Sequence, residues 1–79
     1  MHLDQAKPND VLIVESLDSV PVGRRNALRD LGVYEMGVLH IEGACREGIR
    51  FHKDAGSILI SFEEAAKIEV RKWQRELIP

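Results

Sequence analysis

Two of the three histidines and the single cysteine are the side chains in this sequence best suited to binding a metal ion. His40 and His52 fall in segments that alternate apolar and polar residues, so we expect them on adjacent antiparallel strands, with Cys45 near the connecting turn. Imidazole and thiolate ligands suit zinc or ferrous iron. The spacing matches no common ligand motif, and a structural zinc site normally has four ligands. We therefore expect no bound metal and no other cofactor, and keep these three residues as weak candidates.

Cys45 is also the only thiol that could act as a nucleophile, with the cation of Arg46 beside it. A nucleophile needs an adjacent general base, and the sequence places none nearby. The segment Gly43-Ala44-Cys45 is instead typical of a strand end. The sequence contains neither of the glycine-rich motifs GxxxxGK[S/T] and GxGxxG that bind nucleotide phosphates. We expect no catalytic residues and no enzymatic activity.

Three arginines and two nearby apolar side chains could together bind a protein partner. Arg24, Arg25 and Arg29 lie in a predicted helix, mainly on faces other than the apolar one. A basic patch of this kind would orient an acidic partner surface. Tyr34 and Met36 follow the helix and would add an apolar centre, since aromatic and methionine side chains are enriched in interfaces. We predict that these five residues bind a partner; a solvated helix face and simple loop packing are the alternatives.

The elements that would position these residues follow an all-β pattern, because hydrophobic residues come in short clusters between turn signals. Five strands are expected, over residues 11–17, 38–44, 49–53, 57–61 and 68–70. A helix is predicted over residues 22–31, with Gly23 as a plausible N-cap and Gly32 as a left-handed C-terminal cap. Ser61 and Glu64 match a capping box, which predicts a helical turn through residues 65–67. This inventory suits a small, partly open barrel.

Size and charge favour a binding module. The chain has 79 residues and a formal net charge of −2, with basic and acidic residues interspersed, so we expect one domain and no nucleic-acid binding. The N-terminus does not resemble a signal peptide, and the longest apolar run, residues 11–14, is far shorter than the roughly 20 residues that span a bilayer. A single cysteine fits a reducing compartment. We expect a cytoplasmic protein with no direct membrane insertion.

Four segments resemble the FeoA family in order and spacing, over roughly residues 3–70. They are Lys7-Pro8-Asn9-Asp10, Arg24-Arg25-Asn26-Ala27-Leu28-Arg29-Asp30-Leu31-Gly32, Met36-Gly37 and Phe62-Glu63-Glu64-Ala65-Ala66-Lys67-Ile68-Glu69-Val70. The arginine-rich helix that ends in Leu-Gly carries most of the resemblance. The resemblance implies a mainly β fold over residues 1–71. This fold would be a small five-stranded SH3-like partly open barrel, with one short α-helix after the first strand and a helical turn before the last. Residues 72–79 would form a C-terminal tail extension.

The resemblance implies an accessory protein of bacterial ferrous-iron uptake, which binds FeoB, the membrane transporter with a cytosolic GTP-binding domain, and modulates it. The alternative is a free-standing regulatory domain related to the C-terminal SH3-like domain of DtxR-type iron-dependent repressors, binding a transcription factor or a metal. The sequence has no helix-turn-helix segment, so it could not bind DNA as those repressors do. A small RNA-binding barrel would need exposed aromatic residues among basic ones, whereas Phe51 and Phe62 are expected to be buried.

The tail contains Trp73, Leu77 and Ile78, which would either fold back on the barrel or present an apolar surface. Small free-standing barrels have exposed strand edges, and strand addition between copies is a common way to cover them. The sequence therefore allows a homo-oligomer as well as a heterologous partner.

Overall fold

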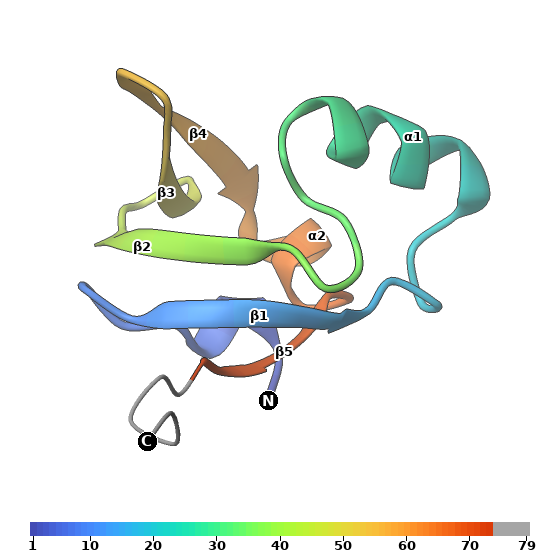
Figure 1. Ribbon diagram of the computed structural model, residues 1–79, viewed down its shortest axis with the longest axis horizontal. Helices are drawn as coiled ribbons and strands as arrows, with labels where there is room; N and C mark the ends of the chain where they lie inside the picture. The colour runs from blue at the N-terminus through green and yellow to red at the C-terminus, as the bar shows by residue number, and fades with distance from the viewer. Residues whose placement is uncertain (74–79) are drawn as a thin grey trace, which may run out of the picture.

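The computed structural model describes residues 1–73, which form one antiparallel sheet of five strands in the order β4-β3-β2-β1-β5 (Figure 1). The strands are β1 (Val11–Ser16), β2 (Val38–Ala44), β3 (Gly48–Lys53), β4 (Gly56–Ser61) and β5 (Glu69–Lys72). The helices are the 3-10 helix η1 (Leu3–Gln5), α1 (Val22–Asp30) and α2 (Phe62–Ala65). The predicted mainly β class with five strands is confirmed. The sheet is not closed, because β4 and β5 remain its two edges.

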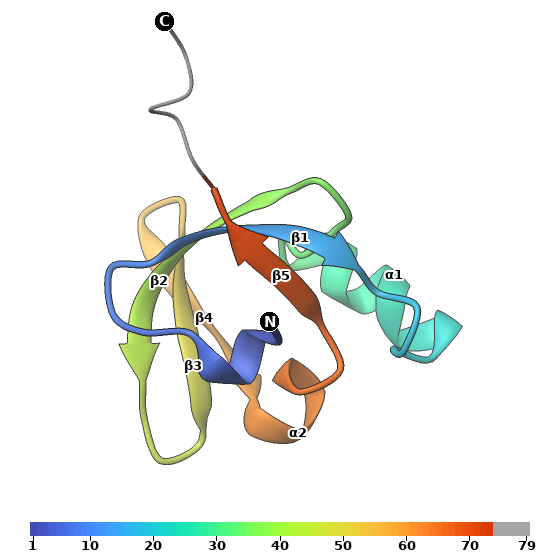
Figure 2. The ribbon, with the colours of Figure 1, turned by 90° about the horizontal axis from the view of Figure 1, so that it is seen from below.

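Strands β2, β3 and β4 form the predicted meander. Leu39 and Ile41 of β2 are buried, as are Ile49 and Phe51 of β3, while the alternate residues face outward. The β2 ladder shifts register next to Gly43, and the sheet bends around its apolar face (Figure 2). Strands β3 and β4 pair without interruption from Gly48↔Ser61 to Lys53↔Gly56.

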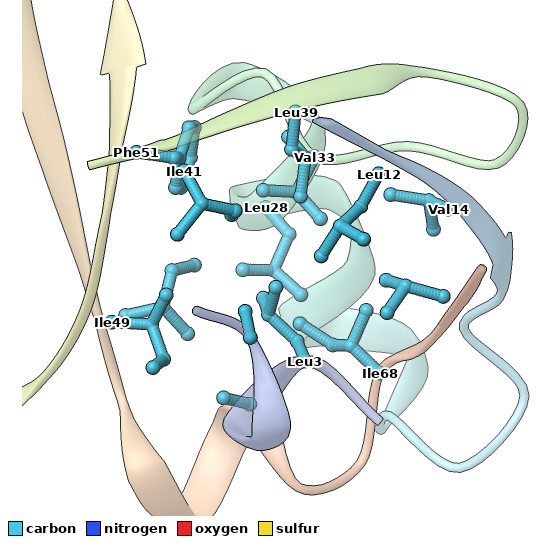
Figure 3. Packing of buried hydrophobic residues seen from close by; sticks show 14 of the residues in the cluster. Leu3, Leu12, Val14, Leu28, Val33, Leu39, Ile41, Ile49, Phe51 and Ile68 are labelled. Atoms are coloured by element: carbon cyan, nitrogen blue, oxygen red, sulfur yellow. The ribbon is translucent and has the colours of Figure 1, made fainter. Parts of the chain in front are cut away.

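The core is a single cluster between the concave face of the sheet, η1 and α1 (Figure 3). Its large, fully buried members are Leu3, Leu12, Val14, Val20, Leu28, Val33, Leu39, Ile41, Ile49, Phe51, Ile60 and Ile68. Leu3 comes from η1, an element that the sequence analysis did not predict. Its burial follows from tertiary packing, because η1 lies against β3 and α2, and the Leu3 N–H donates to the Ile68 carbonyl at 2.9 Å.

The two described ends of the chain lie side by side at β5. The Val70 N–H donates to the Met1 carbonyl at 2.8 Å, and His2 forms a bridge with Glu69. Lys72 pairs with Leu12, so the predicted boundary between residues 71 and 72 falls inside β5. The predicted apolar tail residues Leu77 and Ile78 lie outside the described residues.

Helix α1 ends within one residue of the predicted range 22–31, whereas α2 lies earlier than predicted. Pro21, not Gly23, is the N-cap of α1, and Gly32 has the expected left-handed backbone at φ 98°. Helix α2 begins one residue after Ser61, whose hydroxyl accepts the Glu64 N–H, so the helical turn lies earlier than residues 65–67.

The expected burial of Phe62 is wrong, because its side chain is 40% exposed. The fully buried residue of α2 is instead Ala65, at the end of the helix. Within residues 1–73, no helix has the length and apolar character needed to cross a membrane.

Candidate protein-binding site

Helix α1 packs on the core through one side chain. Leu28 is the only fully buried residue of α1, and Ala27 beside it is half-buried. The C-terminal end is fixed by Lys53, whose Nζ donates to the Asp30 carbonyl at 2.7 Å. The predicted arginines therefore lie on the faces of α1 that point away from the core.

Arg24 does not present a free charge, because it is paired with Glu64. Its Nε and Nη2 atoms donate to the two carboxylate oxygens, each at 2.8 Å, and so join α1 to α2. The hydrogen bond from Arg24, opposed by burial and assisted by the charges of Arg24 and Lys67, lowers the pKa of Glu64 below its ordinary value of 4.5. The same contact raises the pKa of Arg24. The capping box is consequently only half formed, since the Glu64 carboxylate binds Arg24 instead of the Ser61 backbone.

This ion pair predicts a pH dependence of stability. A carboxyl group whose pKa is lowered by folding stabilises the folded state above its unfolded value and loses that effect as the pH falls through its folded value. The free energy of unfolding of the wild type should thus fall more steeply than that of Glu64→Gln as the pH drops below 4.5. Urea titrations from neutral to acid pH measure the difference.

Glu63→Gln serves as the control for this titration, because Glu63 is the exposed neighbour in the same helical turn. It should retain the acid-dependent loss of the wild type. If Glu64→Gln loses stability as steeply as the wild type does, the pair makes no contribution that depends on pH.

Arg25 also serves the structure of this region. Its guanidinium donates to the carbonyls of Val20 at 2.8 Å and Asp18 at 3.1 Å, both in the connection between β1 and α1. The Leu17 N–H donates to Glu35 Oε2 at 3.3 Å, so Glu35 holds the start of the same connection. Glu35 is not among the residues predicted from the sequence, where its only signal is a charge inside a turn between Tyr34 and Met36.

Arg29 is the arginine of the three that remains available. It is exposed, and its guanidinium forms no hydrogen bond or ion pair with any other residue in the range 1–73. It borders an open hollow of about 380 Å³ between α1 and the turn that follows it. The hollow is lined by Leu17, Asp18, Arg25, Arg29, Tyr34 and Glu35.

Tyr34 and Met36 are both exposed, at 49% and 67%, in a turn closed by the Gly37 N–H donating to the Tyr34 carbonyl. The Met36 N–H donates to the Val14 carbonyl at 2.8 Å, which fastens the turn to β1. Met36 has a positive φ of 70°, an uncommon conformation for a bulky residue and one that costs about 1–3 kcal/mol. The fold therefore presents an apolar side chain to solvent from a strained backbone position.

The metal candidates are only partly brought together. His40 and His52 lie on neighbouring strands and are exposed, and His52 Nδ1 is 3.3 Å from Glu42 Oε2. Cys45 instead contacts Glu47, with its Sγ 3.4 Å from Oε1. The described part of the chain holds no group of three or more His, Cys, Asp or Glu side chains that could bind a metal ion.

Comparison with family models, curated proteins and solved structures finds no match to this chain. Any function assigned to it therefore depends on the surface geometry described above and on the sequence resemblance.

Proposed function

We propose that this chain is a FeoA-type SH3-like module that binds the cytosolic side of a FeoB-type ferrous-iron transporter and modulates it through protein–protein contacts. The observation that carries the proposal is the cluster of Arg29, Tyr34 and Met36 at the end of α1 and in the following turn, here called the α1 surface. Its members are exposed, and the guanidinium of Arg29 has no partner within residues 1–73. No catalytic group is required for this role.

The strand arrangement supports the SH3-like part of the proposal. Strand β1 lies between β2 and β5, the strands β2, β3 and β4 follow one another as a meander, and α2 joins β4 to β5. A bent, five-stranded sheet with this order, whose outer strands β4 and β5 do not pair with each other, fits a small, partly open barrel. The strand and helix order is the one that the FeoA resemblance implies, so the fold is compatible with the resemblance.

Two of the five predicted contact residues already have partners within the molecule. Arg24 and Arg25 are hydrogen-bonded within the molecule, so removing either would disturb the fold as well as the surface. Arg29 offers a charge without that complication, and Met36 offers an apolar tip. We assign the electrostatic contact to Arg29 and the apolar contact to Tyr34 and Met36, because charged residues orient docking and apolar residues supply affinity.

The test is binding of the purified chain to the FeoB-type transporter of the same organism, with iron uptake as a second readout. Arg29→Glu should slow association by about threefold or more at low salt, because steering depends on charge. Met36→Asn should weaken binding by about tenfold, the loss expected for a central apolar contact. The same variant should raise stability, since asparagine tolerates the left-handed backbone better.

Arg46→Glu is the matched control, because it makes the same charge change in the exposed turn between β2 and β3. It should leave binding unchanged. Equal effects of Arg29→Glu and Arg46→Glu would show that net charge alone matters. Wild-type protein that neither binds the transporter nor alters uptake would refute the proposed function.

A further inference from the structure

Strand β4 is an open edge of the sheet. Among residues 1–73 it pairs only with β3, and in an antiparallel ladder alternate residues of an edge strand direct their N–H and C=O groups away from the sheet. Its sequence, Gly-Ser-Ile-Leu-Ile-Ser, contains no charge and no proline, and its pairing with β3 has no bulge. Leu59 is 39% exposed on it. The features by which proteins usually block such edges are missing here.

The opposite edge is protected. Residues 1–3 cover the start of β5 through the hydrogen bonds of Met1 and Leu3 and the bridge between His2 and Glu69. The remaining residues of β5, Arg71 and Lys72, are charged, and both form ion pairs with neighbouring strands or turns. Within the described range, β4 is thus the edge that can accept another strand along its full length.

We propose that β4 is a dimerisation edge, where a second copy of this chain adds its own β4 in antiparallel orientation. A molecule with one open edge pairs through the same edge on both copies, and the resulting two-fold dimer is closed and does not propagate. An uncharged strand can lie beside its own copy without repulsion. Antiparallel pairing also keeps the two Glu63 carboxylates at opposite ends, whereas parallel pairing would bring them together. This inference does not depend on the proposed function.

The experiment measures the mass of the full chain by sedimentation over a range of concentrations. The wild type should reach twice the 8.9 kDa of one chain. Leu59→Glu should weaken self-association by about tenfold or more, because the two new carboxylates would lie near the two-fold axis. Within its own molecule, the introduced carboxylate would lie opposite Arg50 of β3, so the fold should be retained. Leu59→Lys should weaken self-association to a similar degree, and an equimolar mixture of the two variants should recover the dimer.

Val38→Glu is the matched control, because Val38 has the same 39% exposure but lies on β2, in the middle of the sheet. It should remain dimeric. Hydrogen exchange of the wild type gives a second readout that needs no variant: the amides of β4 should become more protected as the concentration rises.

Three results would overturn the proposal. One is a wild type that stays monomeric up to about 1 mM, the weak end of specific association. Another is a dimer broken by Val38→Glu and not by Leu59→Glu. The third is a set of β4 amides that become protected only when a different protein is added, which would make the edge a site for a foreign strand.

Discussion

Gly48→Ala is expected to lower the free energy of unfolding by about 3 kcal/mol or more, at the upper end of overpacking effects and a large part of the stability of a small domain. A Cβ at this position would overlap the carbonyl of Ile60 and would lie 2.9 Å from the Ser61 Cα. These are backbone atoms of the paired strand β4, so no side chain can rotate away to make room. Urea unfolding followed by circular dichroism measures the loss.

Gly23→Ala provides the control for this substitution. No atom lies within 4 Å of a Cβ built on Gly23, and the residue is in the first turn of α1. Alanine should stabilise the helix there by up to about 1 kcal/mol, because glycine loses more backbone entropy on folding. If Gly48→Ala unfolds at the same urea concentration as the wild type, strands β3 and β4 are not packed as described.

Leu28→Ala should have the second large effect, a loss of about 2–5 kcal/mol in the free energy of unfolding. Leu28 is fully buried and is the one residue of α1 in the core (Figure 3). The polar contacts of Arg24 and Arg25 lie at the helix surface and cannot replace it, since exposed hydrogen bonds and ion pairs contribute little. The α1 surface should therefore lose its fixed position, and transporter binding should fall with stability.

Hydrogen exchange can separate the loss of global stability in Leu28→Ala from the local loosening of α1. At a temperature where β1 and β2 remain protected, the amides of α1 should exchange faster than in the wild type. Val22→Ala in the same helix is the control, because Val22 is 68% exposed and its truncation should change neither stability nor exchange. Unchanged α1 protection in Leu28→Ala would mean that other contacts hold the helix.

Local sequence signals predicted the elements well. The alternation of Leu39 and Ile41 with outward residues located β2, and the N-cap at Ser61 located α2 within a few residues. Gly32 was predicted to be left-handed from its place after a helix, and it is. Each of these features depends on residues close together in the chain, so pattern and propensity are sufficient.

Contacts between distant segments could not be predicted in this way. Glu64 was expected to complete a capping box, but it binds Arg24, 40 positions away. The crowding at Gly48 exists only because β4 runs beside it, and Leu3 is buried because η1 packs against β3 and α2. At the candidate site, the sequence singled out Tyr34 and Met36 as side chains that could form an apolar surface. The distinction between the engaged Arg24 and Arg25 and the available Arg29 required the fold.

The pairing of the N-terminal residues with β5 has a consequence for how the chain folds. Met1 and Val70 are hydrogen-bonded across 69 positions, and β1 is flanked by β2 and β5. During synthesis, the meander from β2 to β4 can form first, while Leu12 and Val14 remain without their last neighbour. Bringing the two ends of the chain together closes a long loop, which costs entropy before the contacts form. Small all-β domains accordingly fold in milliseconds to seconds. The meander should therefore gain protection from exchange earlier in refolding than β1 and β5.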